Sequence, residues 1–329
     1  MADYKSIKGF KVQSLASDPT LVQGQVWYNT TGSVLKYQSM AAGAWAAGGA
    51  IQTSRYAMGG SGTTPAGLIF GGNDLTATET YNGTAWTEVT DLNTGRSNPG
   101  GIGVQTATLC AGGNPAPIND YNEEWNGASW TEKADLTTGR TLMGSCGTTT
   151  AGLLAGGGAI PGPEGGNLDI VEEWNGASWS EEADLNTARG GLKAGPEGTT
   201  TAAIVFGGRT TATNTTNTGV TEEYNGTAWT EVTALNTSRY EMGSGGNQDS
   251  AVSAGGSFSG PTQSVVEQWD GSSWTEVANL ATSRHNMGAG GSGTDMFVAG
   301  GYTCCSPVGT ITSTEEWTRA LTVKTVTVS

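Results

Sequence analysis

A fixed spacing between a tryptophan and an arginine recurs six times along this chain of 329 residues. In every case the arginine lies ten positions after the tryptophan, so the segment that joins them does not vary in length. The six pairs are Trp45 and Arg55, Trp86 and Arg96, Trp130 and Arg140, Trp179 and Arg189, Trp229 and Arg239, and Trp274 and Arg284. A Gly-Gly pair follows each arginine by sixteen residues, or by eighteen in the fourth repeat. A period of this size indicates stacked structural units.

The composition agrees with a folded repeat and excludes several partners. The 53 glycines would suit low-complexity disorder, but the 11 tryptophans argue against it, because disordered segments lack such large apolar side chains. The formal charge of −15 repels phosphate backbones and anionic lipid surfaces, so we expect no nucleic-acid partner. The sequence has no visible secretory signal and no apolar run long enough for a transmembrane segment, so we expect no membrane insertion.

Each repeat predicts four short strands. An apolar run such as 66–70, directly before a Gly-Gly pair, is typical of a strand buried on both faces. Asn-Gly or Asp-Gly then lies between two aromatic residues, as in the segment 81–86, which predicts a hairpin with a type I′ turn. The stretch after each arginine is rich in Gly, Ala and Ser, and such a strand fits where neighbouring units crowd near a central axis. Four antiparallel strands per repeat predict an all-β propeller.

These motifs resemble the Kelch family of β-propellers. The shared features are a Gly-Gly pair that closes the second strand, an aromatic residue in the third, a tryptophan that opens the fourth, and an arginine where the next blade begins. The resemblance covers residues 45–317 and implies a ring of four-stranded antiparallel blades. It implies little about function, because one fold carries many functions.

The two ends of the repeat region complete each other. The last repeat lacks the Asn-Gly hairpin and its tryptophan, while Trp45 stands alone before the first arginine. We therefore expect the strand around Trp45 to close a sixth blade and to remove exposed sheet edges. The alternating segment 321–328 predicts another strand, and its pairing with a hairpin at 25–37 would give the alternative of a seventh, degenerate blade. The expected domains are an attachment arm with a β-hairpin at 1–38 and a propeller at 39–329, closed by N- and C-terminal strands.

A glutamate stands two positions before the third-strand aromatic residue of every repeat. These residues are Glu79, Glu123, Glu172, Glu222, Glu267 and Glu315. A functional interpretation would be an acidic or catalytic ring, but a residue repeated in every blade is better explained as part of the blade. A partly buried arginine paired with a carboxylate is a common way to pin adjacent strands. We therefore expect the arginines and glutamates to pair, and the six tryptophans to lie between adjacent blades.

Length variation is confined to the connection between the second and third strands. The distance from the Gly-Gly pair to the third-strand aromatic residue varies from nine residues after Gly72 to seventeen residues after Gly157. We expect this connection to emerge on the same face as the joints between blades. Loops on a rigid scaffold are where recognition usually resides. The candidate binding residues on this face are Asn114, Asp120, Tyr121, Asp169, Phe258 and Tyr302. The alternative is that the loops are tolerated insertions without a partner. We expect no cofactor, and calcium in an acidic loop such as 164–169 stays open as an alternative.

The sequence lacks the catalytic motifs of known propeller enzymes, and we expect that the chain is not an enzyme. The copper oxidases that share the Kelch fold need histidine ligands beside tyrosines, whereas this chain has one histidine, His285. The segment 270–274 differs in spacing from the Asp box of sialidases. Neither a phosphate loop nor a nucleophile elbow is present, and we expect no metal site.

The N-terminal segment lies outside the repeat. Its Asp18-Pro19 pair and the run from Gly24 to Thr31 resemble segments near the start of bacteriophage tail-fibre and other virion proteins. This resemblance implies a structural protein that is made in the host cytoplasm and assembled into a virion. Its expected partners are copies of itself, other virion proteins and a host-surface glycan. The alternatives are that the segment only caps the propeller, and that the chain is a carbohydrate- or protein-binding propeller unrelated to a virus.

Overall fold

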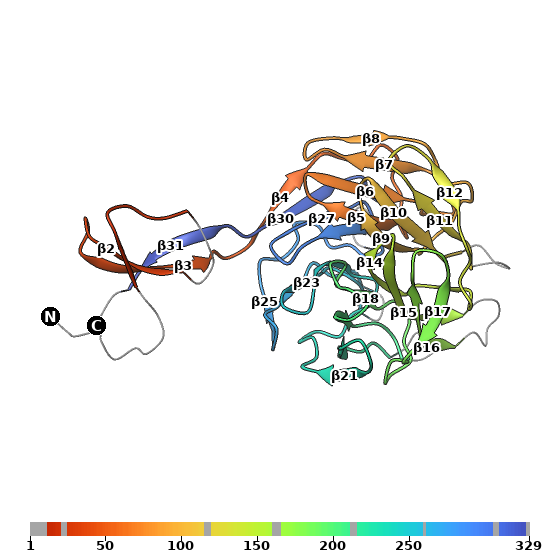
Figure 1. Ribbon diagram of the computed structural model, residues 1–329. Coiled ribbons are helices and arrows are strands. Elements are labelled where there is room, and N and C mark those ends of the chain that lie inside the picture. The colour runs from red at the N-terminus through yellow and green to blue at the C-terminus, as the bar shows by residue number, and fades with distance from the viewer. Residues whose placement is uncertain are drawn as a thin grey trace. The chain divides into compact units, whose positions relative to one another are not determined.

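The computed structural model describes residues 12–20, 25–114, 120–159, 166–210, 216–258, 261–304 and 309–326. Across these ranges the chain forms strands, turns and loops and no helix, so nothing described there is a helix able to cross a membrane. The contacts within the chain divide it into two units, Ala44–Thr318 and a smaller unit made of Met1–Gly43 and Arg319–Ser329. Both units are sheets of short strands (Figure 1).

The larger unit consists of six antiparallel sheets that follow one another along the chain. The first blade contains β5 (Gly59–Thr63), β6 (Ala66–Phe70), β7 (Thr78–Tyr81) and β8 (Trp86–Glu88). The second contains β9 (Gly100–Val104), β10 (Ala107–Ala111), β11 (Asn122–Trp125) and β12 (Trp130–Glu132). The third contains β14 (Gly144–Thr148), β15 (Ala151–Ala159), β16 (Asn167–Trp174) and β17 (Trp179–Glu182), and β13 (Arg140–Thr141) also pairs with β15. The next two are β18 (Lys193–Ala194), β19 (Ala203–Phe206), β20 (Thr221–Tyr224) and β21 (Trp229–Val232); and β22 (Gly243–Gly246), β23 (Ala251–Ala254), β24 (Val266–Trp269) and β25 (Trp274–Glu276).

The sixth blade is closed by a strand from the beginning of the chain. It contains β26 (Gly288–Gly291), β27 (Asp295–Ala299), β30 (Thr314–Thr318) and β4 (Ala44–Gly48), and the short pair β28 (Tyr302–Thr303) and β29 (Gly309–Thr310) lies in its loop. Trp45 pairs with Trp317 in the ladder, and their ring centroids are 5.4 Å apart. Strand β5 contacts both β9 and β26, so the ring closes after six blades. The expectation of a six-bladed propeller is confirmed, and the alternative of a seventh blade in the ring is wrong.

A ring of backbone hydrogen bonds joins all six blades. The residue two positions after each arginine donates its N–H to the carbonyl oxygen of the equivalent residue in the preceding blade, over 2.7 to 3.2 Å. These residues are Ala57, Asn98, Leu142, Gly191, Glu241 and Asn286, and their φ angles lie between 54° and 69°. The left-handed region costs most non-glycine residues roughly 1–2 kcal/mol. The closed ring holds five of them in this conformation and links each blade to its two neighbours.

The inner strands can approach one another because they are rich in glycine. A Cβ atom added at Gly60 would lie 2.4 Å from the carbonyl oxygen of Ala289, and one added at Gly101 would lie 2.4 Å from that of Gly60. Backbone therefore packs directly on backbone between neighbouring blades near the axis. This arrangement confirms the prediction that the Gly-rich strands crowd at the centre of the ring.

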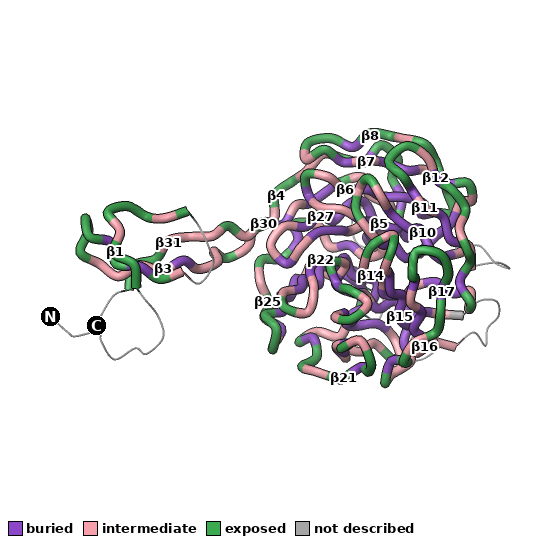
Figure 2. The backbone as a smooth tube through the Cα atoms, in the orientation of Figure 1, coloured by how far each residue is buried: buried purple, intermediate pink, exposed green. Residues whose placement is uncertain are grey.

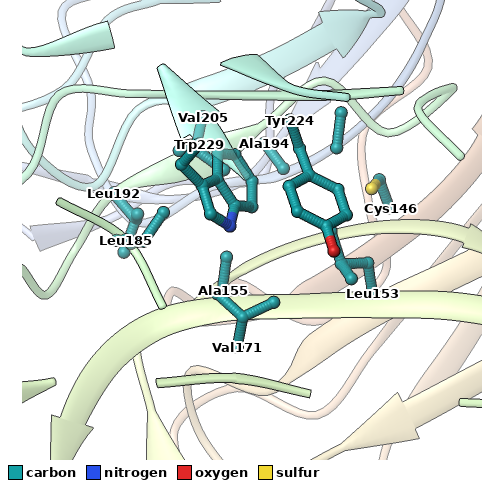
Figure 3. Close-up of a cluster of buried hydrophobic side chains, with 11 residues drawn as sticks. Cys146, Leu153, Ala155, Val171, Leu185, Leu192, Ala194, Val205, Tyr224 and Trp229 are labelled. Carbon is teal, nitrogen blue, oxygen red and sulfur yellow. The ribbon is translucent and has the colours of Figure 1, made fainter. Parts of the chain in front are cut away.

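The fourth-strand tryptophans fill the space between blades. Trp229 lies with Tyr224 and Val205 of its own blade against Ala155 and Val171 of the preceding one (Figure 3). Figure 2 shows that burial is concentrated inside the propeller unit, whereas the residues after each tryptophan on the outer strands are exposed. Three indole N–H groups also donate to threonine hydroxyls of the preceding blade, in the pairs Trp86–Thr314, Trp130–Thr78 and Trp274–Thr221, over 2.9 to 3.1 Å. The tryptophans therefore hold adjacent blades together, as expected.

The hairpin between the third and fourth strands differs from the predicted type I′ turn. Tyr81 pairs with Trp86, and of the intervening residues only Gly83 has a positive φ, at 85°. A type I′ turn needs a positive φ at both central residues. Instead of adopting that conformation, Asn82 uses its side-chain oxygen to accept the N–H groups of Thr84 and Ala85, each over 2.9 Å. The same arrangement recurs at Asn126, Asn175, Asn225 and Asp270.

The smaller unit is one sheet with the order β1 (Gln13–Leu15), β2 (Val26–Asn29), β3 (Val34–Met40) and β31 (Leu321–Thr325). Strand β1 pairs in parallel with β2, and β31 pairs with β3. The predicted C-terminal strand therefore exists and pairs with the predicted hairpin, but residues 327–328 and the whole segment 1–11 lie outside the described residues. The expected boundary at 38/39 moves to 43/44, and the C-terminal strand belongs to this unit instead of closing the propeller.

We predict that Trp179→Ala lowers the free energy of unfolding by about 3–5 kcal/mol, because the indole is buried among Ile102, Leu109 and Leu154 and its loss would leave a cavity between two blades. Chemical denaturation measures this loss. Trp45→Ala is the matched variant at the half-buried tryptophan of the sixth blade and should cost less. A loss below about 1 kcal/mol for Trp179→Ala would contradict the packing role.

Candidate functional site

In the second to sixth blades a buried arginine donates to carbonyl oxygens at the base of the variable loop, and the fifth blade illustrates the geometry. Arg239 Nη1 donates to the carbonyl oxygens of Gly255, over 2.7 Å, and Val265, over 2.6 Å. These two residues are the ends of the connection between the second and third strands. Arg239 Nη2 donates to Glu267 Oε1 over 2.9 Å. The loop is therefore fixed at its base whatever its length.

The same arginine–glutamate pair is present in every blade. The pairs are Arg55–Glu79, Arg96–Glu123, Arg140–Glu172, Arg189–Glu222, Arg239–Glu267 and Arg284–Glu315. Both side chains are almost entirely buried, and burial lowers the pKa of Arg189 to about 10, although Glu222 acts in the opposite direction. The expected pairing is thus observed, and the two sets form no open acidic ring.

Each glutamate also fixes the joint that enters its blade. Its second oxygen accepts the backbone N–H of the residue three positions before the arginine, over 2.7 to 2.8 Å. In the fifth blade Glu267 Oε2 also accepts the side-chain N–H of Asn236, over 2.9 Å. The carboxylate therefore binds both the arginine and the ten-residue joint, which explains why the joint has a constant length.

The candidate site lies on the face where the connections between second and third strands emerge, which we call the loop face. Aromatic and charged side chains gather there on one part of the ring. The ring centroid of Tyr302 lies 5.7 Å from that of Tyr56 and 5.6 Å from that of His285, with edge-on geometry in both cases. His285 Nδ1 lies 2.9 Å from Glu241 Oε2. In the neighbouring blades, the guanidinium carbon of Arg209 lies 3.2 Å from the ring centroid of Tyr240. We call the six residues Arg209, Tyr240, Glu241, His285, Tyr302 and Tyr56 the aromatic arc.

The arc occupies a defined part of the repeat. Tyr56, Tyr240 and His285 each directly follow one of the six buried arginines, and Glu241 follows Tyr240. The blades on the other side of the ring carry Ser97 and Thr141 at that position. Tyr56 is 37% exposed, so part of the arc is open to a ligand. Aromatic faces beside hydrogen-bonding groups are typical of sites that bind polar organic ligands such as sugars.

The predicted binding residues are spread over four blades, and only Tyr302 joins the arc. Tyr121 contributes to the clamp of its own blade, because its carbonyl oxygen accepts Arg96 Nη1 over 2.8 Å and its ring lies 5.9 Å from that guanidinium. The carbonyl oxygens of Asp120 and Asp169 each accept an N–H from the adjoining joint, over 2.9 Å. The remaining two, Asn114 and Phe258, lie at loop bases, where Asn114 pairs with Ser97 and Phe258 is 47% exposed.

Sequence reasoning missed Tyr56, Tyr240, Glu241 and Arg209, and it considered His285 only as a metal ligand. The available signal was the residue directly after each arginine, which is large or charged in some blades and small in others. Among the described residues, no group of three or more His, Cys, Asp or Glu side chains could hold a metal ion. Of the acidic loop considered for calcium, 164–169, residues 164 and 165 lie outside the described residues.

The fold defines this chain as a six-bladed β-propeller with an additional small sheet. No protein-family profile matches the sequence, and no curated protein matches it. Among solved structures, the structure of YjhT is similar with a TM-score of 0.70 at 14% identity, over 84% of this chain and 99% of that chain. At this identity the likeness shows the fold alone.

This comparison corrects the expectation that the chain is not an enzyme. The likeness to YjhT extends across the whole of that protein, so the propeller is a scaffold shared with proteins whose sequences are very different. One fold hosts catalytic and non-catalytic functions through different sites, and short sequence motifs do not transfer at this distance. The lack of familiar motifs was therefore no ground for excluding catalysis.

We predict that Arg239→Met lowers the free energy of unfolding by about 3–5 kcal/mol, because it leaves the buried Glu267 without its partner. The double variant Arg239→Met/Glu267→Leu should lose clearly less than the sum of the two single losses, which a double-mutant cycle in urea would measure. Glu276→Gln is the control, since that carboxylate is exposed and its loss should change stability by about 0.5 kcal/mol or less. Strictly additive losses at Arg239 and Glu267 would refute the clamp.

Proposed function

We propose that the protein is a structural and recognition component of a bacteriophage particle, and that its propeller, of the Kelch type, contacts a ligand through the loop face. The observation that carries the proposal is the aromatic arc, which lies on the same face as loops whose bases bind a buried arginine in the second to sixth blades. A rigid base lets the loops differ in length and sequence without loss of the fold. Such a surface suits recognition of a varied partner.

The ligand that fits the arc best is a neutral host-surface glycan. Tyr56 and Tyr302 offer ring faces and edges to the apolar side of a sugar, while His285, positioned by the buried Glu241, supplies a hydrogen-bonding group. The formal charge of −15 disfavours strongly anionic ligands by long-range repulsion. An adjacent subunit of the particle is the partner of second choice for the same face.

The association with a particle is supported by the smaller unit. Its sheet includes part of the segment that resembles the start of phage tail-fibre and virion proteins. The contacts within the chain group this sheet as a unit distinct from the propeller. This division suits one module for attachment, to copies of the chain or to other virion proteins, and one for recognition. The competing function is a carbohydrate- or protein-binding propeller outside any virus, which the aromatic arc would serve equally well.

Two measurements test the proposal. Mass spectrometry of purified particles from the source should detect this chain at a stoichiometry comparable with other structural proteins, and its absence from particles would favour the competing function. Binding to an array of neutral glycans should weaken roughly tenfold or more in Tyr302→Ala and in Tyr56→Ala, because each removes one ring from the arc. Thr87→Ala, on the exposed outer strand β8, is the control and should bind normally. Equal binding by all four proteins would refute the assignment of the arc.

A further inference from the structure

A cavity of about 40 Å³ lies on the axis of the propeller and is lined by residues from all six blades. The side chains of Met58, Met143, Met242 and Met287 are part of its wall, together with glycine backbone and two serines. Lys193 is the one charged side chain in this lining. An ammonium group in such a place is costly unless a partner of opposite charge is present.

Lys193 departs from the repeat. The equivalent residue is glycine in the other five blades, at Gly59, Gly100, Gly144, Gly243 and Gly288. At three of these a Cβ atom would collide with a branched side chain of the next blade, in the pairs Gly100–Leu154, Gly243–Val298 and Gly288–Ile69, over 2.7 to 2.8 Å. The residue that corresponds to those branched side chains in the blade after Lys193 is Ser253. The lysine is thus matched by a small residue that leaves room for its stem.

The polar groups around Lys193 are left without partners of their own. Within the described part of the chain, neither the Lys193 ammonium nor the hydroxyl of Ser244, which also lines the cavity, forms a side-chain hydrogen bond or ion pair. The Ser253 hydroxyl is fully buried and has no hydrogen-bond partner among the described residues. Glu241 is the carboxylate that counteracts the desolvation of Lys193, but its Oε2 atom already binds His285 and Asn286, over 2.9 and 2.7 Å.

We propose that the axial cavity binds one small monovalent anion of halide size, held by Lys193 Nζ and Ser244 Oγ. The volume allows this choice, because the centres of water-sized spheres can occupy about 40 Å³ of the cavity, more than the roughly 10–15 Å³ that one water molecule needs. The anion neutralises the lysine at the point where the six inner strands meet. This site is independent of the loop-face ligand and of the particle.

Crystals of the full chain grown in bromide provide the direct test. An anomalous difference peak on the propeller axis, within hydrogen-bond distance of Lys193 Nζ and Ser244 Oγ, is the expected result. The axial peak should disappear in Lys193→Gly, a variant that installs the residue of the other five blades. Bromide peaks confined to the outer surface, or an axial peak that persists in Lys193→Gly, would overturn the proposal.

A solution measurement distinguishes the site from general salt effects. In buffers of equal ionic strength, replacing gluconate, a much larger anion, by chloride should raise the Tm of the wild-type chain by about 2–4 °C. Lys193→Gly and Lys193→Met should each lose this rise, and using two variants guards against one that folds poorly. A chloride-dependent rise of equal size in either folded variant would overturn the proposal, as would no rise in the wild type.

Discussion

The pairing of a buried arginine with a buried glutamate is the interaction on which the rest of this propeller depends. A guanidinium that is removed from water needs acceptors for its N–H groups and a countercharge, and the blade supplies both from fixed places. In the fifth blade, Arg239 takes its countercharge from the third strand and its carbonyl acceptors from the two ends of the variable loop. The glutamate then binds the incoming joint. One charge pair therefore positions three segments that are distant in the sequence.

Ring closure adds a second constraint, which acts across blades. The hydrogen-bond ring through Ala57, Leu142 and their equivalents closes only if every blade presents its N–H and carbonyl groups at the same angle to its neighbours. The left-handed backbone conformation at these residues is unfavourable by itself. It is retained because the ring of hydrogen bonds satisfies their backbone N–H and carbonyl groups. The inner glycines allow the approach, so the Arg–Glu pair sets the blade and the axial ring sets how the blades meet.

Features that repeat at constant offsets were predictable from the sequence, whereas contacts between different kinds of position were not. The blades, the Arg–Glu pairs and the buried tryptophans follow from spacing alone. The turn type was wrong because the side chain of Asn82 satisfies the backbone without a left-handed asparagine. The pairing of the C-terminal strand with the N-terminal hairpin was anticipated only as a seventh blade, because alternation along a strand does not show whether the resulting sheet joins the ring or forms a separate unit. A buried apolar residue six positions after each tryptophan was overlooked, at Ile51, Leu92, Leu136, Leu185, Leu235 and Leu280.

Scaffold and site occupy different positions within the same repeat. The arginine is constant because every blade needs the Arg–Glu pair. The residue directly after it has no such structural role and varies from Ser97 to Tyr240. A ring of six identical faces could not distinguish the orientation of a ligand, so recognition requires that symmetry be broken at positions that the fold leaves free. The aromatic arc, in or beside the fourth to sixth blades and the first, breaks this symmetry, and so does Lys193 in the fourth blade. The variable positions of a regular repeat are therefore where its chemistry should be sought.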